Sequence, residues 1–425
     1  MEFIEFSKIW NEQPVVIPDT NAILDLYRYS PSTSQHVLKL LNRISDYIWI
    51  PHQVKEEYLI QYMHVISIEK RKYSELTNQI SKVIQKSREN VSNHFKSYRG
   101  DEHPKINQLV DIVEAKLSEI ENEAKRFHDE IKEEVQKHDF MFDTGNVKLF
   151  MDLMGEKEQI GPEFTYREKI DLYVEGDSRY LRKIPPGYMD EVKDKDDITK
   201  TKKFGDLLIW KQLLSHAELN EKPIIFITND NKEDWWVLEN KRPIEARPEL
   251  HEEFKSYSEQ AFIMISLREF INYIEQIFDI QNIVAYFELN GARLMENMVA
   301  QIGWQKKLNL SNILLQNSDF CNCFEKLTNV EINSIIEDEI YLSSAQYSRD
   351  TDMVKLAGSF SLTLEITSIE YEFFKSDGEV KVEGFVEVTF ELTNHKQNEI
   401  KPETVNIIFS GYNIAAYTER LLNIV

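Results

Sequence analysis

The first part of the chain alternates short apolar runs with stretches of helical spacing. Val15 to Ile17 is an apolar run between two prolines, which predicts a buried strand. Polar residues at 19–21 then provide helix N-cap chemistry, and a second helical pattern covers residues 31–41. Residues 47–50 form another apolar run, which predicts a second strand. A strand–helix–strand order is typical of a parallel sheet.

The same alternation returns after residue 203. Residues 204–216 have the spacing of a helix, and residues 223–228 predict another buried strand. Residues 263–265 predict the last strand, and a helix is expected over 267–278. Together with the first part, these elements predict an α/β fold around a parallel sheet, within a domain that spans residues 1–280.

Two long helical arms interrupt this domain at about residues 59–144. Both arms lack glycine and proline, and residues 100–104 between them have turn composition. From Ile106 to Ile131, apolar residues recur at alternating intervals of four and three, which is a heptad seam. We therefore expect an inserted antiparallel helical hairpin. Residues 145–203 are rich in polar and turn residues and predict an irregular loop.

The chain changes character after residue 281. Apolar residues alternate with polar ones over 360–366 and again over 380–392, which predicts antiparallel strands with one solvated face. Between these runs we expect a hairpin turn at residues 376–378 and a β-bulge at 367–368. Residues 281–425 are therefore interpreted as a separate, β-rich α+β domain of unknown role.

Composition narrows the class of protein. The 425 residues are 42% hydrophobic and 29% charged, an ordinary globular mixture, and two cysteines exclude a disulfide scaffold. The sequence shows neither a long apolar span nor the features of a signal peptide, so we expect a cytoplasmic protein with no membrane partner. The net charge of −23 argues against non-specific coating of nucleic acid, but it is compatible with a local basic groove.

Open parallel sheets bind ligands beyond the carboxyl ends of their strands, and four acidic residues are candidates for that edge. Asp19 and Asp230 lie just beyond predicted strands, Glu57 lies in the first turns of a helix after a strand, and Asp206 begins the helix before the strand at 223–228. Carboxylates that meet at one edge repel one another, and a divalent cation such as Mg²⁺ or Mn²⁺ is the usual compensation. One or two such ions activate water for phosphodiester hydrolysis. Taken singly, each acid also has an ordinary interpretation, as a helix cap, a turn residue or a solvated side chain.

The segments around these acids resemble the four motifs of PIN-domain nucleases. The motifs occur in order within residues 13–275, at 15–24, 49–58, 204–210 and 227–230. Spacing within the second motif selects Glu57 over Glu56. Two segments are most similar to a bacterial PIN-like subgroup with a long helical insertion. They are residues 19–29, which continue the first motif to Tyr29, and Pro185-Pro186-Gly187-Tyr188.

The resemblance implies a three-layer α/β/α sandwich that cleaves nucleic acid with the help of a metal. It implies that Asp19 and Asp206 ligate the main Mg²⁺ or Mn²⁺ ion and that Glu57 completes the acidic cluster. Asp230 would hold a second ion or orient the attacking water.

Other residues would support this cluster or contact the substrate. Three would hydrogen-bond to the metal-binding carboxylates, namely Thr20, Asn21 and Thr228. Asp234 would add an outer carboxylate unless it is a surface acid. Four cationic residues near the motifs are candidates for phosphate contact: Arg28, Arg182, Lys183 and Lys203. Tyr188 would stack on a base, and Arg28 equally suits a structural ion pair.

From these observations we expect a metal-dependent endonuclease that acts on nucleic acid, with RNA favoured. One alternative is a structure-specific DNA nuclease of the flap-endonuclease type. Another is a degenerate PIN fold that serves as an interaction scaffold. A role as a toxin or phage-defence effector is a further expectation. In that role, a regulatory protein partner or a homo-oligomer would form through the hairpin or the C-terminal domain.

Overall fold

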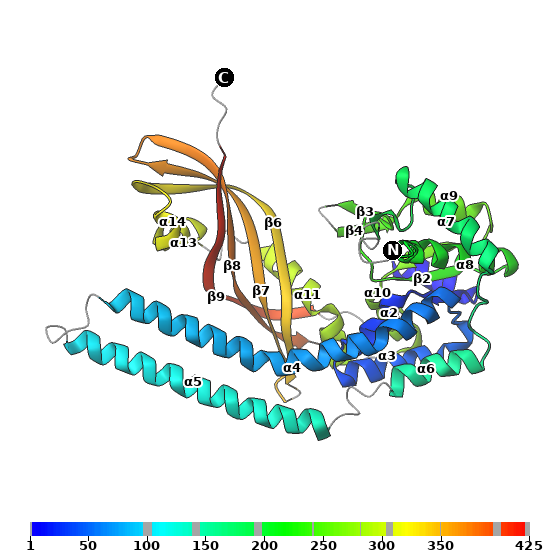
Figure 1. Cartoon of the computed structure of the whole chain (residues 1–425), viewed down its shortest axis with the longest axis horizontal. Coiled ribbons are helices and arrows are strands. Elements are labelled where there is room, and N and C mark those ends of the chain that lie inside the picture. The colour runs from blue at the N-terminus through cyan, green and yellow to red at the C-terminus, as the bar shows by residue number, and fades with distance from the viewer. Residues whose placement is uncertain are drawn as a thin grey trace. The chain divides into compact units, whose positions relative to one another are not determined.

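The chain folds into two compact units, Met1–Ile274 and Glu275–Val425. The computed structural model describes residues 2–96, 104–137, 145–190, 198–239, 242–280, 282–302, 309–348, 350–393 and 401–420. The first unit is built around a short parallel sheet and the second around a long antiparallel sheet (Figure 1).

The parallel sheet confirms the expected α/β fold. Its strands are β1 (Val15–Pro18), β2 (Ile224–Ile227) and β5 (Phe262–Ile265), in the order β1-β2-β5. Every residue of the central strand β2 is buried, because a parallel sheet covered on both faces needs apolar side chains on both.

The expected strand at residues 47–50 is wrong in extent. The 3₁₀-helix η2 (Ser45–Tyr47) takes up its first position, so only the last three residues are extended. These make isolated parallel bridges, Ile48 to Val16 and Ile50 to Ile160. An apolar run alone cannot reveal how many of its residues find a hydrogen-bonding partner.

Helices surround this sheet: α1 (Phe3–Asn11), α2 (Thr20–Leu24), α3 (Pro31–Arg43), α8 (Gly205–Leu219), α9 (Pro248–Lys255) and α10 (Leu267–Phe278). Two 3₁₀-helices, η1 (Asp25–Tyr27) and η5 (Lys202–Phe204), precede α3 and α8. An antiparallel ribbon of β3 (Trp236–Glu239) and β4 (Arg242–Ala246) follows β2. The expected helices at 204–216 and 267–278 thus correspond to α8 and α10.

The prediction that residues 145–203 are irregular is wrong for two stretches. They contain α6 (Gly145–Glu156) and α7 (Tyr166–Leu181). Thr165 and Glu168 form a reciprocal capping box at the start of α7. Only Gly176 and Tyr180 of α7 are buried, so this helix has almost no apolar stripe that periodicity could detect.

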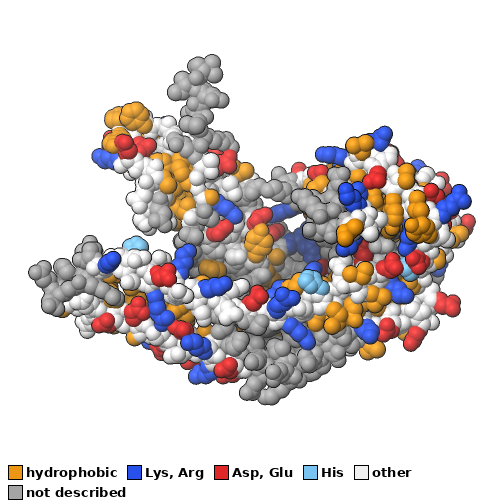
Figure 2. All heavy atoms as spheres, viewed as in Figure 1, with side chains coloured by type: hydrophobic (Ala, Val, Ile, Leu, Met, Phe, Trp, Pro, Cys, Tyr) orange, Lys and Arg blue, Asp and Glu red, His pale blue; other side chains and the backbone are white. Residues whose placement is uncertain are grey.

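The long insertion is a pair of helices, α4 (His52–Phe95) and α5 (Pro104–Lys137), which lie side by side (Figure 1). Arg88 on α4 bridges the two helices through ion pairs with Glu114 and Glu121 on α5. The heptad seam is only partly buried: Val110 and Ala124 are enclosed, whereas Ile120 and Phe127 are about half exposed. The side chain of Ile131 lies outside the described residues. Acidic and basic side chains are interspersed along the visible face of this pair (Figure 2).

The second unit consists of one antiparallel sheet and three described helices. Its strands are β6 (Leu327–Ser348), β7 (Met353–Glu370), β8 (Phe374–Thr393) and β9 (Lys401–Arg420), in sequential order, and its helices are α11 (Ile283–Ile302), α13 (Leu310–Gln316) and α14 (Ser318–Cys321). The even-numbered residues of β7 from Val354 to Ile366 are buried, and α11 and α13 pack against β6. This matches the expected β-rich domain with one covered face.

Two local predictions for this sheet are wrong. The hairpin turn lies at residues 371–373, where Tyr371 and Glu372 have positive φ angles of 49° and 69°, and not at 376–378. The pairing of β7 with β8 is also continuous through 367–368, so the expected bulge is missing there. A register shift instead falls on β6 beside Asn333.

None of the helices in the described part of the chain is both long and apolar enough to cross a membrane.

Candidate functional site

The carboxyl ends of β1 and β2 bring two of the predicted acids to one edge of the sheet. Asp19 follows β1 and its backbone N–H donates to Ile227 O at 2.8 Å. Asp230 lies three residues beyond the end of β2, after Thr228 and Asn229. Since neighbouring parallel strands end together, this is where a ligand would meet both side chains.

Asp19 is the most enclosed of the four acids. Only 5% of the residue is exposed, and it is the N-cap of α2. Its Oδ1 accepts from Thr20 N at 2.6 Å, and its Oδ2 accepts from Asn21 Nδ2 at 2.6 Å and from Thr228 Oγ1 at 2.8 Å. The helix-cap interpretation is therefore correct for Asp19, but the cap also fixes a buried carboxylate at the end of the strand.

Glu57 lies beside Asp19 because one threonine binds both. Thr20 donates its N–H to Asp19 and its hydroxyl to Glu57 Oε2, the latter at 2.8 Å. Gln53, one turn earlier on α4, donates to Glu57 Oε1 at 3.0 Å. Gly205 leaves room for this carboxylate, since a Cβ atom at that position would lie 2.4 Å from Glu57 Oε1. The first residues of α4 and α8 thus meet at Glu57.

The electrostatic state of Asp19 reflects this crowding. Burial raises the pKa of Asp19 to about 7, and the negative charges of Glu57 and Asp230 act in the same direction. Hydrogen bonds from Thr228 and Thr20 oppose the shift because they favour the charged form. A buried carboxylate among other acids is the arrangement that a nearby positive charge would stabilise.

Asp206 approaches the cluster from the first turn of α8. Its Oδ2 accepts from Trp235 Nε1 at 3.2 Å. Gly187, with φ of +90°, allows close approach here, because a Cβ atom at this residue would lie 3.1 Å from the Cβ of Asp206. Burial raises the pKa of the nearby Tyr180, and the charges of Asp206 and Asp190 add to that effect. The Pro-Pro-Gly-Tyr segment therefore packs against the acid site.

Lys232 engages both oxygens of Asp230. Its N–H donates to Asp230 Oδ1 at 3.1 Å and its Nζ donates to Oδ2 at 2.7 Å. The same Nζ donates to Asp190 Oδ1 at 2.8 Å. Burial lowers the pKa of Lys232, but the hydrogen bonds to Asp190 and Asp230 outweigh it, so the pKa is raised overall. Lys232 is therefore a charged ammonium group next to the acids.

Asp234 is fully buried, which excludes the interpretation as a surface acid. Its Oδ2 accepts from Met189 N at 3.0 Å, while its Oδ1 has no partner among the described residues. Burial raises the pKa of Asp234, and the neighbouring charges of Asp230 and Asp190 add to the shift.

The candidate substrate contacts lie in different environments. Arg28 forms an ion pair with Asp25, and its side chain is half exposed. Arg182 and Lys183 are exposed at the end of α7. By contrast, Lys203 is 8% exposed, pairs with Asp177 at 3.0 Å and lies over the ring of Phe204.

Tyr188 is also buried, at 8% exposure, and its hydroxyl lies 3.4 Å from Glu233 O. Tyr188 and Lys203 would have to move before they could contact a nucleic acid.

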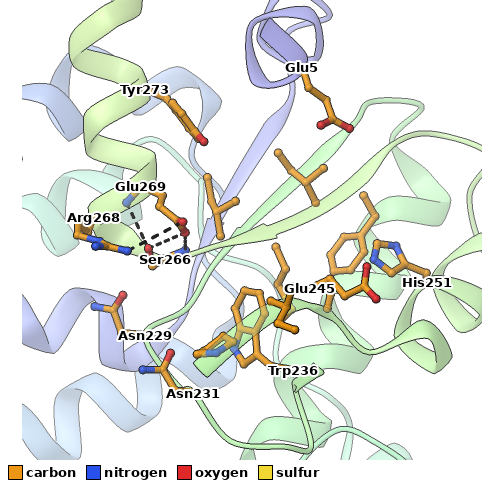
Figure 3. A pocket seen from close by; sticks show the side chains of 17 residues that line it. Glu5, Asn229, Asn231, Trp236, Glu245, His251, Ser266, Arg268, Glu269 and Tyr273 are labelled. Carbon is orange, nitrogen blue, oxygen red and sulfur yellow. Dashed lines mark hydrogen bonds and ion pairs between the residues drawn. The ribbon is translucent and has the colours of Figure 1, made fainter. Parts of the chain in front are cut away.

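A groove of about 570 Å³ is lined by Asn229 and Asn231, the chain neighbours of Asp230 (Figure 3). Glu269 binds Ser266 at one end of the groove, where Arg268 also lies. His251 and Glu245 lie at the other end (Figure 3). The mixed charge of this lining differs from the basic track that a phosphate backbone requires.

The donors at the acid site suit a hard divalent cation, because they are carboxylate oxygens. Within the described residues, no three acidic, histidine or cysteine side chains are already close enough to hold an ion together. The charge balance at the site nevertheless fits a cation. Burial raises the pKa of Asp19, its acidic neighbours add to that shift, and Asp230 already attracts the ammonium of Lys232. An ion here would replace repulsion with attraction.

Sequence reasoning did not single out Gln53 or Lys232. Gln53 precedes Glu57 by four residues on one helix, a spacing that places two side chains on the same face. Lys232 follows Asp230 by two residues, but its contact with Asp190 depends on a loop 42 residues away. Helical spacing could therefore have identified Gln53, whereas no local pattern indicates the second contact of Lys232.

The comparison with protein families points to the same part of the chain. A family model described as a PIN-like domain matches residues 15–250, more than half of the sequence. The matched range includes all four acids and the helical insertion. No curated protein and no solved structure matches the chain.

Proposed function

This chain belongs to the family of PIN-like domains, and on that basis we propose that it is a metal-dependent endonuclease that acts on RNA. PIN domains are generally metal-dependent nucleases, typically using divalent metals such as Mg²⁺. The observation that carries the proposal is the buried Asp19, which shares Thr20 with Glu57 and Thr228 with Asp230. These links gather acids from distant parts of the sequence at one strand edge.

In this proposal Asp19, Glu57, Asp206 and Asp230 would hold Mg²⁺ or Mn²⁺. When bound, such an ion supplies an activated water and neutralises charge on the phosphate. Thr228 and Asn21 fix the orientation of Asp19 by donating to its Oδ2. Thr20 and Gln53 fix Glu57 in the same way, so the carboxylates are oriented before substrate arrives.

The charge of the chain limits how substrate binds. A net charge of −23 opposes general attraction of nucleic acid, so binding would be confined to the acid site and to the candidate phosphate contacts Arg28 and Arg182. We therefore expect weak binding without the divalent cation. This would distinguish the protein from a nucleic-acid-coating protein.

The proposal is tested by incubating the full chain with Mn²⁺ and single-stranded RNA, RNA hairpins, tRNA and flapped DNA. The Asp19→Asn variant is the negative control. We expect cleavage of at least one RNA by the wild type and none by the variant. Cleavage of flapped DNA alone would favour the alternative of a structure-specific DNA nuclease. Equal cleavage by both proteins would exclude a role for Asp19.

A partner-binding role is supported by exposed apolar residues on α4. Leu59, Ile60 and Met63 are 52%, 78% and 57% exposed. Exposed apolar clusters often mark contacts with another protein or another copy. In the scaffold alternative this surface would be the functional part, and Mn²⁺ titration by calorimetry separates the two roles, because a scaffold has no reason to bind metal at Asp19.

A toxin or phage-defence role, with a regulatory partner, is a further part of the proposal. It is supported by the family and by the presence of a second unit outside the matched residues. Growth arrest on induction that disappears in Asp19→Asn is the expected result. Arrest that persists in the variant would contradict the role.

A further inference from the structure

We propose that Lys232 is an internal counter-ion that competes with the divalent cation for Asp230 and thereby sets the affinity of the site for that cation. The inference rests on the metal-dependent function proposed above. It concerns a residue outside the four acidic motifs, and it assigns that residue a role in the state without metal.

Lys232 occupies both oxygens of the Asp230 carboxylate. The backbone N–H of Lys232 occupies Oδ1 at 3.1 Å and its ammonium occupies Oδ2 at 2.7 Å. A cation that binds Oδ2 must therefore displace the ammonium or share the oxygen with it. Two positive charges on one oxygen repel each other, so displacement is favoured.

Asp190 keeps the displaced ammonium close to the site. Its Oδ1 accepts from Lys232 Nζ at 2.8 Å, and its side chain is 4% exposed. Lys232 itself is 37% exposed, so its side chain has solvent on one side into which it can turn. The lysine can therefore leave Asp230 without leaving Asp190.

Replacement of the Lys232 ammonium by a divalent cation at Asp230 is favourable only where other acids are near. Asp206 and Asp230 both act on Lys232 electrostatically, and Asp230 in turn acts on Asp19. One lysine offsets a single negative charge of this cluster, whereas a divalent cation offsets two. Lys232 thus stabilises the cluster without metal but leaves enough negative charge to attract an ion.

The chain contains a matched lysine for comparison. Lys211 also bridges two carboxylates, Glu175 at 2.7 Å and Glu253 at 2.8 Å. Within the described part of the chain, it donates no hydrogen bond to any of the four acids. If a bridging lysine matters only as an ion pair, the two lysines should behave alike towards Mn²⁺.

The test is calorimetric titration of the full chain with Mn²⁺, without nucleic acid, for the wild type, Lys232→Met and Lys211→Met. In Lys232→Met, Mn²⁺ no longer has to break the charge-assisted hydrogen bond between Lys232 and Asp230. We therefore expect Lys232→Met to bind Mn²⁺ about tenfold more tightly than the wild type. Lys211→Met should bind like the wild type. Thermal melting without metal should show a lower transition for Lys232→Met, and saturating Mn²⁺ should raise it by more than in the wild type.

The outcomes separate this inference from the proposed function. If the wild type binds Mn²⁺ and Lys232→Met binds it no tighter, the counter-ion role is wrong and the nuclease proposal stands. If neither protein binds Mn²⁺, both are overturned. Should Lys232→Met not fold, Lys232→Arg keeps the positive charge and must bind Mn²⁺ no tighter than the wild type. Tenfold tighter binding by Lys232→Arg would contradict the competition.

Discussion

Thr228 donates its hydroxyl to Asp19 Oδ2 at 2.8 Å, although the two residues are 209 positions apart. The same oxygen of Thr228 accepts from the Asp230 N–H at 3.1 Å and from Asn21 Nδ2 at 3.2 Å. A single buried hydroxyl therefore connects the ends of β1 and β2.

Replacing this hydroxyl should destabilise the first unit. In Thr228→Val, Asp19 loses a donor in a buried position, and we expect the free energy of unfolding to fall by about 1–3 kcal/mol. Thr228→Ser keeps the hydroxyl and should lose less. Urea unfolding followed by tryptophan fluorescence measures this, because five of the six tryptophans lie before residue 275. Equal stability of wild type and Thr228→Val would show that the contact is dispensable.

The absence of a side chain at Gly205 should matter for activity. In Gly205→Ala, the new Cβ would lie 2.4 Å from Glu57 Oε1 and must push that carboxylate aside. A displacement of this size predicts a cleavage rate lower by roughly a hundredfold. Gly155→Ala is the control, since its Cβ would meet Ile160 at 3.7 Å, an ordinary contact. Wild-type rates for both variants would refute the crowding argument.

His216 should make stability depend on pH. Its ring stacks on Trp49 with centroids 4.0 Å apart, and burial lowers its pKa to about 4. The unfolded chain takes up this proton near pH 6.5, whereas the folded chain resists it, so stability is complete above pH 6.5 and falls as the pH drops towards 4. After allowance for partial exposure, the loss is roughly 1–2 kcal/mol.

His216→Phe keeps an aromatic ring against Trp49 and removes the titrating group. We expect its melting temperature to fall less than that of the wild type between pH 7.5 and pH 5. Other groups titrate equally in both proteins, so the difference between them isolates His216. The same loss in both proteins would place the pH dependence elsewhere.

Local signals in the sequence were enough to predict that Asp19 and Asp230 lie at the same edge of the sheet. Asp19 and Asp230 each follow a buried apolar run, and the order of buried runs is enough to place their ends together in a parallel sheet. Glu57 and Asp206 lie in first turns of helices, which the motif spacing identifies. What the sequence could not provide is the set of long-range contacts, such as Lys232 with Asp190.

The second unit shows why local signals also mislead. Polar residues 376–378 have turn composition, yet Asp377 accepts from Thr367 Oγ1 at 2.6 Å and Ser376 lies 2.8 Å from the Ser368 hydroxyl. These cross-strand hydrogen bonds make a polar segment suitable for the interior of a hairpin. The turn itself falls on Tyr371 and Glu372, whose residue types do not favour positive φ.

Cleavage of RNA with Mn²⁺ by the wild type and by Asp206→Asn tests whether the four carboxylates support metal-dependent cleavage. Asp206 is suitable because its Trp235 contact can be retained by the asparagine oxygen, so the fold should be preserved. We predict a loss of at least about a hundredfold in the variant and complete loss in the wild type on addition of EDTA. Equal cleavage by folded Asp206→Asn, or unchanged cleavage in EDTA, would contradict metal-dependent cleavage by these carboxylates.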